Sequence, residues 1–338
     1  MGRPVVSRRG RKGKAVLVLS AADVRRALPM SEAIASQKRA FAALAGGQAE
    51  LPLRTPVAVP EEGARALFMP ARAGSGLGAK IVSVFPKNTA RGLPTVHGVL
   101  ILLEARTGRP AALMDATYLT ALRTGAASGV ATDLLALPGA RTAAVLGTGA
   151  QAATQVLAAC AVRPIARVRV FSRDSSHVAA FLARMQSEVP AALVAAASAA
   201  EAVRDADVVC TATTSATPVF DGRDLKPGTH VNGVGSYTPQ MQEVDTEVVR
   251  RAGRVFVDCR AAALAEAGDV LIPLRQGVIR EADLVELGAV AAGRHPGRTA
   301  LEAVTFFKSV GVAVQDVAAG AEVLRRAREM NLGTEVEL

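Results

Sequence analysis

Along the second half of the chain, short apolar runs alternate regularly with segments that have helical periodicity. The apolar runs are residues 142–146, 168–171, 207–211, 230–234 and 255–258, and the helical segments include 150–160, 177–185 and 199–204. The runs lack the polar alternation of a half-exposed strand, which is typical of strands covered on both faces. Strands that alternate with helices in this way predict right-handed crossovers and a doubly wound parallel sheet.

The first half of the chain has a different pattern, in which strands follow one group of helices and precede another. A strand is predicted at 15–20, helices at 20–28 and 31–44, and further strands at 54–59, 66–70, 79–85, 97–104 and 111–115. An Ala-rich helix follows over 117–137, where Pro138 and Gly139 end it. These elements predict a mixed α+β domain.

Residues 304–328, rich in Val and Ala, predict a last helix that we expect to return to the first domain. The chain would then be an α/β protein in which the parallel sheet is inserted into an α+β domain. The predicted boundaries are a basic tail at 1–14, a first domain at 15–137 plus 305–338, and a second domain at 138–304.

Composition and charge narrow the possible partners. The 338 residues are half apolar, which is enough for two cores, and the formal net charge is +10. Six basic residues and no acidic residue lie in the first 14 positions, which favours a solvated, disordered tail. A nucleic-acid or membrane arm and a transit peptide are the alternatives, but the tail has neither interleaved aromatic residues nor an amphipathic helical pattern. We therefore expect no nucleic-acid or membrane partner.

The cysteines indicate the compartment. Cys160, Cys210 and Cys259 are far apart and form no CxxC pair, so we predict a reducing, cytoplasmic environment. The sequence contains no run of about 18 apolar residues, so we predict no membrane-spanning helix. The four histidines have no metal-ligand spacing, so we predict no metal site.

The most specific motif is a glycine-rich turn between a predicted strand and a predicted helix. Gly147, Gly149 and Ala152 follow the strand at 142–146 with the spacing G-x-G-x-x-A. The first glycine permits a tight turn, the second lets the backbone approach a pyrophosphate, and the third position keeps the helix close to the sheet. The helix N-terminus favours phosphate. A turn without a ligand is the alternative, but the context predicts a Rossmann domain that binds a dinucleotide.

The end of the second strand bears on which dinucleotide binds. Ser172 and Arg173 follow this strand and precede Asp174. An Arg suits the 2′-phosphate of NADP, whereas an acidic residue suits the ribose 2′-hydroxyl of NAD. We predict NADP(H), with NAD(H) and a surface pair between Arg173 and Asp174 left as alternatives.

Three basic residues of the first domain, Arg54, Lys80 and Arg123, have mainly apolar neighbours in the sequence. A buried charge is costly without a partner, and Arg together with Lys suits a carboxylate. Taken alone, each residue could also be a surface side chain whose aliphatic part packs on apolar residues while its charged end stays in water. Their spacing does not link them.

A family resemblance does link them. The chain resembles the ornithine cyclodeaminase/mu-crystallin family after its basic tail, over residues 78–84, 93–98, 114–128, 147–152, 226–235, 258–270 and 305–317. The resemblance implies a homodimer whose first domain binds substrate and forms the dimer. It also implies that Arg54, Lys80 and Arg123 hold a substrate carboxylate. The positions that it implies for the cofactor are Thr95, Ala150, Gln151, Thr213, Val234 and Ser309.

One position departs from the cyclodeaminases, which carry an acidic catalytic residue where this chain has Tyr237. A Tyr with a pKa of about 10 is a poor general base at neutral pH, which argues against ornithine cyclisation. The run from Gly235 to Pro239 resembles instead the ketimine reductase branch. Tyr237 would then contact substrate or form a pocket wall without a chemical role.

The expected activity is the NAD(P)H-dependent reduction of pyrroline-2-carboxylate or piperideine-2-carboxylate to proline or pipecolate. The small cyclic imino acid would bind in the cleft between the domains, and Lys80 would add a proton-relay role. Ornithine cyclodeaminase, alanine dehydrogenase and lyase activities remain alternatives. So does a non-catalytic NADPH-dependent binder of the mu-crystallin type.

Overall fold

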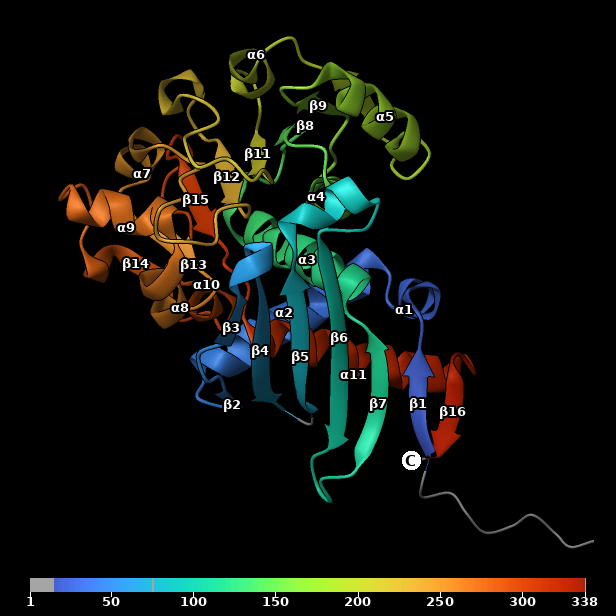
Figure 1. The fold of residues 1–338 in the computed structure, drawn as a ribbon. Helices are drawn as coiled ribbons and strands as arrows, with labels where there is room; N and C mark the ends of the chain where they lie inside the picture. Colours follow the sequence, from blue (N-terminus) through green and yellow to red (C-terminus); the bar gives the residue numbers. More distant parts are fainter. Residues whose placement is uncertain (1–14, 75, 338) are drawn as a thin grey trace, which may run out of the picture.

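The strands form two separate eight-stranded sheets in the computed structural model, which describes residues 15–74 and 76–337 (Figure 1). The predicted basic tail lies outside the described residues. The first sheet has the order β16-β1-β7-β6-β5-β4-β2, with β3 paired to β4. Its strands are β1 (Ala15–Leu19), β2 (Ala49–Glu50), β3 (Thr55–Val59), β4 (Ala64–Ala73), β5 (Gly76–Val84), β6 (Val96–Glu104), β7 (Pro110–Asp115) and β16 (Thr334–Glu337).

The second sheet is parallel throughout and has the order β10-β9-β8-β11-β12-β15-β13-β14. The doubly wound α/β fold predicted from the alternating apolar runs is therefore confirmed. The strands are β8 (Thr142–Leu146), β9 (Arg167–Phe171), β10 (Ala192–Ala195), β11 (Val208–Thr211), β12 (His230–Gly233), β13 (Val255–Val257), β14 (Leu284–Glu286) and β15 (Thr305–Lys308).

Helices cover both sheets and fill the space between them. Those of the first half are α1 (Ala21–Ala27), α2 (Met30–Ala45) and α3 (Thr117–Leu135), with 3-10 turns η1 (Pro60–Glu62) and η2 (Pro86–Arg91). The second half has α4 (Ala150–Val162), α5 (Ser175–Met185), α6 (Ala199–Val203), α7 (Thr246–Ala252), α8 (Arg260–Glu266), α9 (Gly268–Arg275), α10 (Leu287–Ala291) and α11 (Ala313–Glu329), with η3 (Gly222–Asp224) and η4 (Glu281–Asp283).

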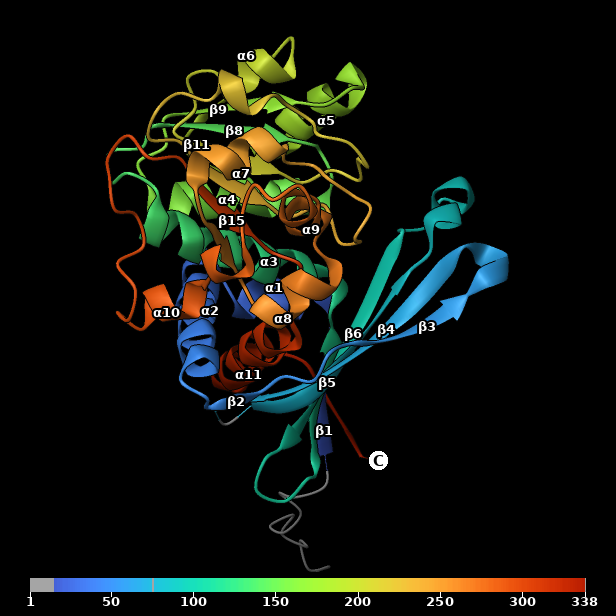
Figure 2. The same ribbon diagram turned by 90° about the vertical axis from the view of Figure 1, so that its left-hand side faces the viewer.

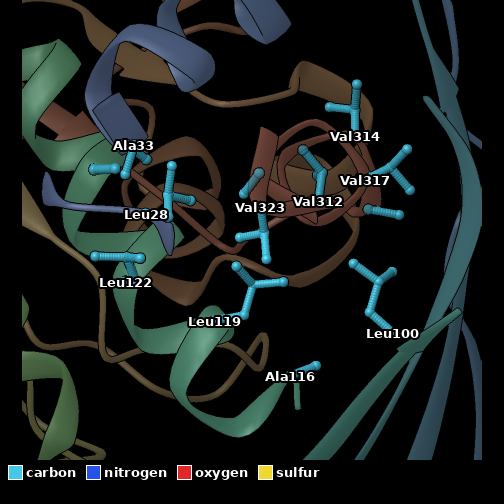
Figure 3. Packing of buried hydrophobic residues seen from close by; sticks show 14 of the residues in the cluster. Leu28, Ala33, Leu100, Ala116, Leu119, Leu122, Val312, Val314, Val317 and Val323 are labelled. Carbon is cyan, nitrogen blue, oxygen red and sulfur yellow. The ribbon is translucent and has the colours of Figure 1, made fainter. Parts of the chain in front are cut away.

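Helix α11 covers one face of the first sheet, and α3 joins this layer to the second domain (Figure 1). Figure 3 shows the core that results, in which Leu100 of the sheet lies near Val317 of α11 and Leu119 of α3. Helix α3 also packs closely on α4, because a Cβ on Gly125 would come within 2.5 Å of Thr154 O. The two domains thus share a tightly packed helical layer.

Among the residues that the structure describes, no helix covers the other face of the first sheet. Figure 2 shows that β3, β4, β5 and β6 extend away from the second domain as an arm that carries η1 and η2 at its end. Large apolar side chains, among them Phe68 and Ile81, are exposed along this sheet.

The prediction of one helix over 304–328 is wrong at its start. Residues Thr305–Lys308 form β15, which lies between β12 and β13, and the helix begins only at Ala313. Thr305, Phe306 and Phe307 are β-branched or aromatic residues that fit a buried strand. The predicted domain boundary between residues 304 and 305 would therefore separate β15 from the rest of the second sheet. The chain returns to the first sheet only with α11. The remaining domain boundaries stay predictions.

Candidate active site

The glycine-rich turn lies at the carboxyl end of β8, at the floor of a groove of about 440 Å³. Gly147 has a φ of +108°, and a Cβ there would come within 2.5 Å of Ala212 O, so no other residue fits without strain. Gly149 has open space where its Cβ would lie. A ligand can therefore approach the backbone of this turn closely.

The N-terminus of α4 fits the phosphates of a dinucleotide. Gly149 is the N-cap of α4 and has no side chain, so the first N–H groups of the helix, beginning at Ala150, have no side-chain acceptor. Gln151 Oε1 is buried without a hydrogen-bond partner among the described residues. The turn thus offers unused backbone donors at the groove, whereas Gln151 is not among the residues that line the groove.

The end of β9 also lies at this groove. Ser172 and Arg173 line it, whereas Asp174 is the N-cap of α5. The carboxylate of Asp174 accepts hydrogen bonds from Ser176 N at 2.9 Å and Ser176 Oγ at 2.6 Å, and these bonds lower its pKa. Asp174 is therefore engaged by its own helix, and Arg173 is the charged residue of this strand end that lines the groove.

The predicted cofactor positions follow the order of the strands along one edge of the sheet. Parallel strands have their carboxyl ends at the same edge, where β9, β8, β11, β12 and β15 are consecutive neighbours. The residues at or just beyond these strand ends are Arg173, Gly147, Thr213, Val234 and Ser309 respectively. Four strand spacings of about 4.8 Å place the first and last of these strands about 19 Å apart. The arrangement provides an extended path for one long ligand.

At the far end of this path, side chains from three elements meet around a buried carboxylate. Asp316 in the first turn of α11 accepts a hydrogen bond from Lys80 Nζ of β5 at 2.8 Å and one from Arg123 Nε of α3 at 2.9 Å. Arg123 Nη1 also donates to Gln315 Oε1 at 3.0 Å. Asp316 is fully buried, and Lys80 and Arg123 are at most 4% exposed.

Burial changes the charge state of this cluster. It lowers the pKa of Lys80 from 10.5 to about 7, with Asp316 opposing the change and Arg123 adding to it. Burial and the nearby Arg123 also lower the pKa of Arg54 to about 10. Lys80 can therefore exchange a proton near neutral pH, whereas Arg54 stays charged there.

Arg54 precedes β3 and has a different partner from the other two cations. Its Nε donates to Glu266 Oε1 of α8 at 2.8 Å, and its Nη2 forms a second bond to the same carboxylate. Arg54 and Glu266 line a small hollow of about 70 Å³ together with apolar side chains that include Met69 and Val312. The structure thus gathers the three predicted cations, but Arg54 pairs across the domains with a residue that the sequence analysis did not identify.

Asp258 fixes the loop at residues 309–311, which lies between the hollow and Arg123. It follows β13 and accepts hydrogen bonds from Ser309 Oγ, Val310 N and Gly311 N at 2.7–3.0 Å. A Cβ on Gly311 would lie 2.4 Å from Arg123 Nη1, so the backbone packs directly on the guanidinium. Ser309, predicted at the cofactor, is thereby fixed at the edge of the sheet.

Tyr237 lies between the two domains, where the guanidinium carbon of Arg65 on β4 is 5.4 Å from the ring centre. Its neighbour Ser236 belongs to a buried network: Ser236 Oγ donates to Asp269 at 2.5 Å, and Lys308 Nζ donates to Ser236 O at 2.7 Å. Lys308 also forms an ion pair with Asp269 at 2.9 Å.

Glu243 extends this network to the groove. It accepts hydrogen bonds from Thr213 N and Gly235 N, both at 2.6 Å, and burial raises its pKa. The network therefore fixes the loops after β11 and β12 from inside the protein. The sequence analysis did not identify this network, because its members come from loops, a strand and a helix, and Asp269 bonds Ser236 across 33 residues.

Among the predicted cofactor residues, Ala150, Gln151, Val234 and Ser309 lie near the turn or the sheet edge but line neither the groove nor the hollow. Thr95 also lines neither, and it lies on the arm. It precedes β6 on the arm, where its Oγ1 lies 3.3 Å from Thr89 Oγ1 and its carbonyl accepts a hydrogen bond from Phe85 N. Neither the residues that line the groove nor those that line the hollow include it.

Neither a metal cluster nor a membrane-spanning helix is found in the described part of the chain. Among residues 15–74 and 76–337, no group of three or more His, Cys, Asp or Glu side chains is placed to hold a metal ion. None of the helices that the structure describes has the length and apolar character needed to cross a bilayer.

Comparison with known proteins places this site in a family. Residues 14–331 match the model of the ornithine cyclodeaminase/mu-crystallin family. The chain belongs to this family. It is 38% identical over 325 residues to a Delta(1)-pyrroline-2-carboxylate reductase of Bacillus cereus, with 95% of this chain and 100% of that protein covered. The resemblance seen in the sequence is therefore confirmed.

Two solved structures extend the comparison to the fold. The Delta(1)-pyrroline-2-carboxylate reductase of Thermococcus litoralis, in complex with NADH and L-proline, superposes with a TM-score of 0.91 at 38% identity, covering 95% of this chain and 100% of that one. An archaeal alanine dehydrogenase dimer with bound NAD has a TM-score of 0.89 at 33% identity, covering 96% and 99%. Both structures contain a bound nicotinamide dinucleotide and share the architecture of this chain.

Proposed function

We propose that this protein is an NAD(P)H-dependent reductase of cyclic ketimine carboxylates, which converts pyrroline-2-carboxylate to proline or piperideine-2-carboxylate to pipecolate. The observation that carries the proposal is the meeting of Arg54, Lys80 and Arg123 at one end of the dinucleotide path. These cations come from a loop, a strand and a helix far apart in the sequence. Such a cluster suits a small carboxylate beside the reacting end of a nicotinamide.

The residues of the chain then have distinct tasks. Arg54, Lys80 and Arg123 bind the substrate carboxylate and orient the C=N bond. A bound reduced nicotinamide supplies a hydride to the imine carbon. The imine nitrogen takes up a proton, and Lys80 is suited to relay it because its pKa is lowered to about 7. Asp316 keeps Lys80 Nζ oriented at 2.8 Å.

The groove supports the cofactor part of the proposal. Gly147, Gly149, Ala150 and Gln151 would hold the pyrophosphate, and Thr213, Val234 and Ser309 would follow the dinucleotide towards the nicotinamide. Ser172 and Arg173 favour NADP(H), because Asp174 is engaged as a helix cap. The compared structures contain NADH and NAD, so use of NAD(H) remains the competing outcome.

The pocket wall argues for reduction over cyclisation of a diamine. Tyr237 packs against Arg65 and would border the substrate without acting as a base. An alanine dehydrogenase activity has specific support from the fold similarity to that enzyme. A non-catalytic NADPH-dependent binder would use the same groove without consuming the cofactor.

A homodimer belongs to the proposal. The uncovered face of the first sheet carries apolar side chains at Val57, Phe68, Ile81 and Leu113, each at least 38% exposed. Phe68 and Ile81 are directly paired on neighbouring strands. A contiguous apolar face of this kind is typical of an interface, and a second copy of the chain is the partner that fits.

The test is a substrate panel with NADH and NADPH, in which the loss of reduced cofactor is followed. Pyrroline-2-carboxylate and piperideine-2-carboxylate should each drive oxidation of the cofactor, and the chromatographed product should be proline or pipecolate. Turnover with pyruvate plus ammonia, but not with the cyclic imines, would establish an alanine dehydrogenase. Thermal stabilisation by the imines without cofactor oxidation would establish a binder.

A further inference from the structure

We infer that Glu266 is a specificity-determining residue, which pairs with the protonated ring nitrogen of the substrate once the substrate carboxylate has taken its place on Arg54. This inference rests on the proposed function and adds a second point of recognition. Its starting observation is the two-point ion pair between Arg54 and Glu266 inside the small hollow.

The position of the pair favours an exchange of partners at one edge of the Arg54 guanidinium. Arg54 and Glu266 come from different domains, and their side chains are only 15% and 20% exposed. A carboxylate that binds Arg54 through Nε and Nη2, the edge of the guanidinium that Glu266 now holds, must occupy the place of Glu266. The ligand therefore separates a partly buried ion pair, and Glu266 is left without its cation.

A lone carboxylate in such a place carries a desolvation cost that a new cation would offset. Arg123 and Lys80 do not pair with Glu266 in the structure: both bind Asp316, and their remaining donors would face the substrate carboxylate under the proposed function. In an α-imino or α-amino carboxylate the nitrogen lies on the carbon next to the carboxylate. A ligand bound to Arg54 thus brings its own positive charge close to Glu266. The ligand carboxylate then pairs with Arg54, and the ligand nitrogen pairs with Glu266.

The rest of the hollow favours the nitrogen as the partner of Glu266. Its other lining residues include Leu51, Met69, Ala262 and Val312, which offer no side-chain charge. Glu266 is the acidic side chain among the residues that line it. The hollow therefore selects a small zwitterion with an apolar ring and discriminates against carboxylates that lack a basic nitrogen.

The experiment compares two ligands of nearly the same shape that differ at the nitrogen. The dissociation constants of L-proline and cyclopentanecarboxylate are measured by calorimetry on the full-length protein saturated with oxidised cofactor, for the wild type and for Glu266→Gln. We expect the variant to bind proline at least about tenfold more weakly and to bind cyclopentanecarboxylate as well as the wild type does or better. Arg54→Gln is the matched control and should weaken both ligands.

Equal weakening of both ligands by Glu266→Gln would overturn the inference, because a structural role affects them alike. Tighter binding of both would also overturn it, since Glu266 would then only compete for Arg54. Glu266→Asp, which keeps the charge on a shorter side chain, should retain part of the preference for proline and serves if the Gln variant does not fold. Because binding is measured, the result is independent of turnover: a wild type inactive on cyclic imines would contradict the proposed function alone.

Discussion

Lys80 Nζ lies 2.8 Å from the carboxylate of Asp316, 236 residues further along the chain, and neither side chain has more than 1% of its surface exposed. Arg123 binds the same carboxylate from a third element. One buried anion therefore holds together two cations that would otherwise repel each other. This relationship makes the substrate end of the cleft sensitive to changes at Asp316.

Replacing Asp316 with Asn should lower the free energy of unfolding by about 3–5 kcal/mol, because it leaves two buried cations without a counter-charge. Denaturant titration followed by circular dichroism measures this change. Glu329→Gln removes the partner of Arg325 in an exposed pair on the same helix and should change stability little. A similar loss in both variants would contradict the special role of the buried cluster.

The affinity for carboxylates should fall as the pH rises through neutrality. Burial lowers the pKa of Lys80 to about 7, so its positive charge is present below this pH and is lost above it. The dissociation constant of cyclopentanecarboxylate, whose carboxyl group stays ionised between about pH 6 and 9, should therefore increase across this range. Lys80→Met should bind more weakly, with an affinity that no longer varies with pH. A wild-type profile as flat as that of the variant would exclude Lys80 as the titrating group.

Cofactor preference should depend on Arg173 and not on Asp174. Arg173→Ala should raise KM for NADPH by about tenfold or more and leave KM for NADH nearly unchanged, because the guanidinium would contact only the 2′-phosphate. Asp174→Ser is the matched control, since Ser can still cap α5. A switch of preference in the control, or equal losses with both cofactors in Arg173→Ala, would show that this strand end recognises the ribose differently.

The two glycines of the turn should respond differently to alanine. Gly149→Ala should fold with a loss of about 1 kcal/mol, because its backbone is extended and its Cβ would point into open space, yet it should bind dinucleotide poorly. Gly147→Ala should lose at least about 2 kcal/mol as well, because of its positive φ and the contact with Ala212. Thermal unfolding and cofactor titration separate these effects. Normal cofactor binding by Gly149→Ala would show that the dinucleotide does not bind at this turn.

A charged pair on the uncovered sheet face should dissociate the dimer. Phe68→Glu combined with Ile81→Glu places two acidic side chains side by side on β4 and β5, where a second copy would bury them. Light scattering after gel filtration should show a monomer for this double variant. Leu301→Glu, at a side chain that is 75% exposed elsewhere, should leave the mass unchanged. A dimer in both cases would require a different interface.

Much of this protein follows from local sequence alone. The period of the apolar residues and the G-x-G-x-x-A spacing depend on residues that are close together in the sequence, so they predicted the parallel sheet and its glycine-rich turn. The capping box that Ser20 and Asp23 form at the start of α1 depends equally on residues only three positions apart. The error at β15 arose where a four-residue strand and a helix follow each other within one apolar stretch.

Tertiary structure decided what the charged residues do. Asp174 could pair with a ribose or cap a helix, and only the formation of α5 commits it to the cap. Glu266 gave no signal, because its partner Arg54 is 212 residues away. Folding brings such groups together by the packing of whole elements, and the energy of a buried charge depends on every neighbour that excludes water. The sequence therefore determined the fold and the cofactor turn, whereas only the assembled cleft determined how its charges are paired.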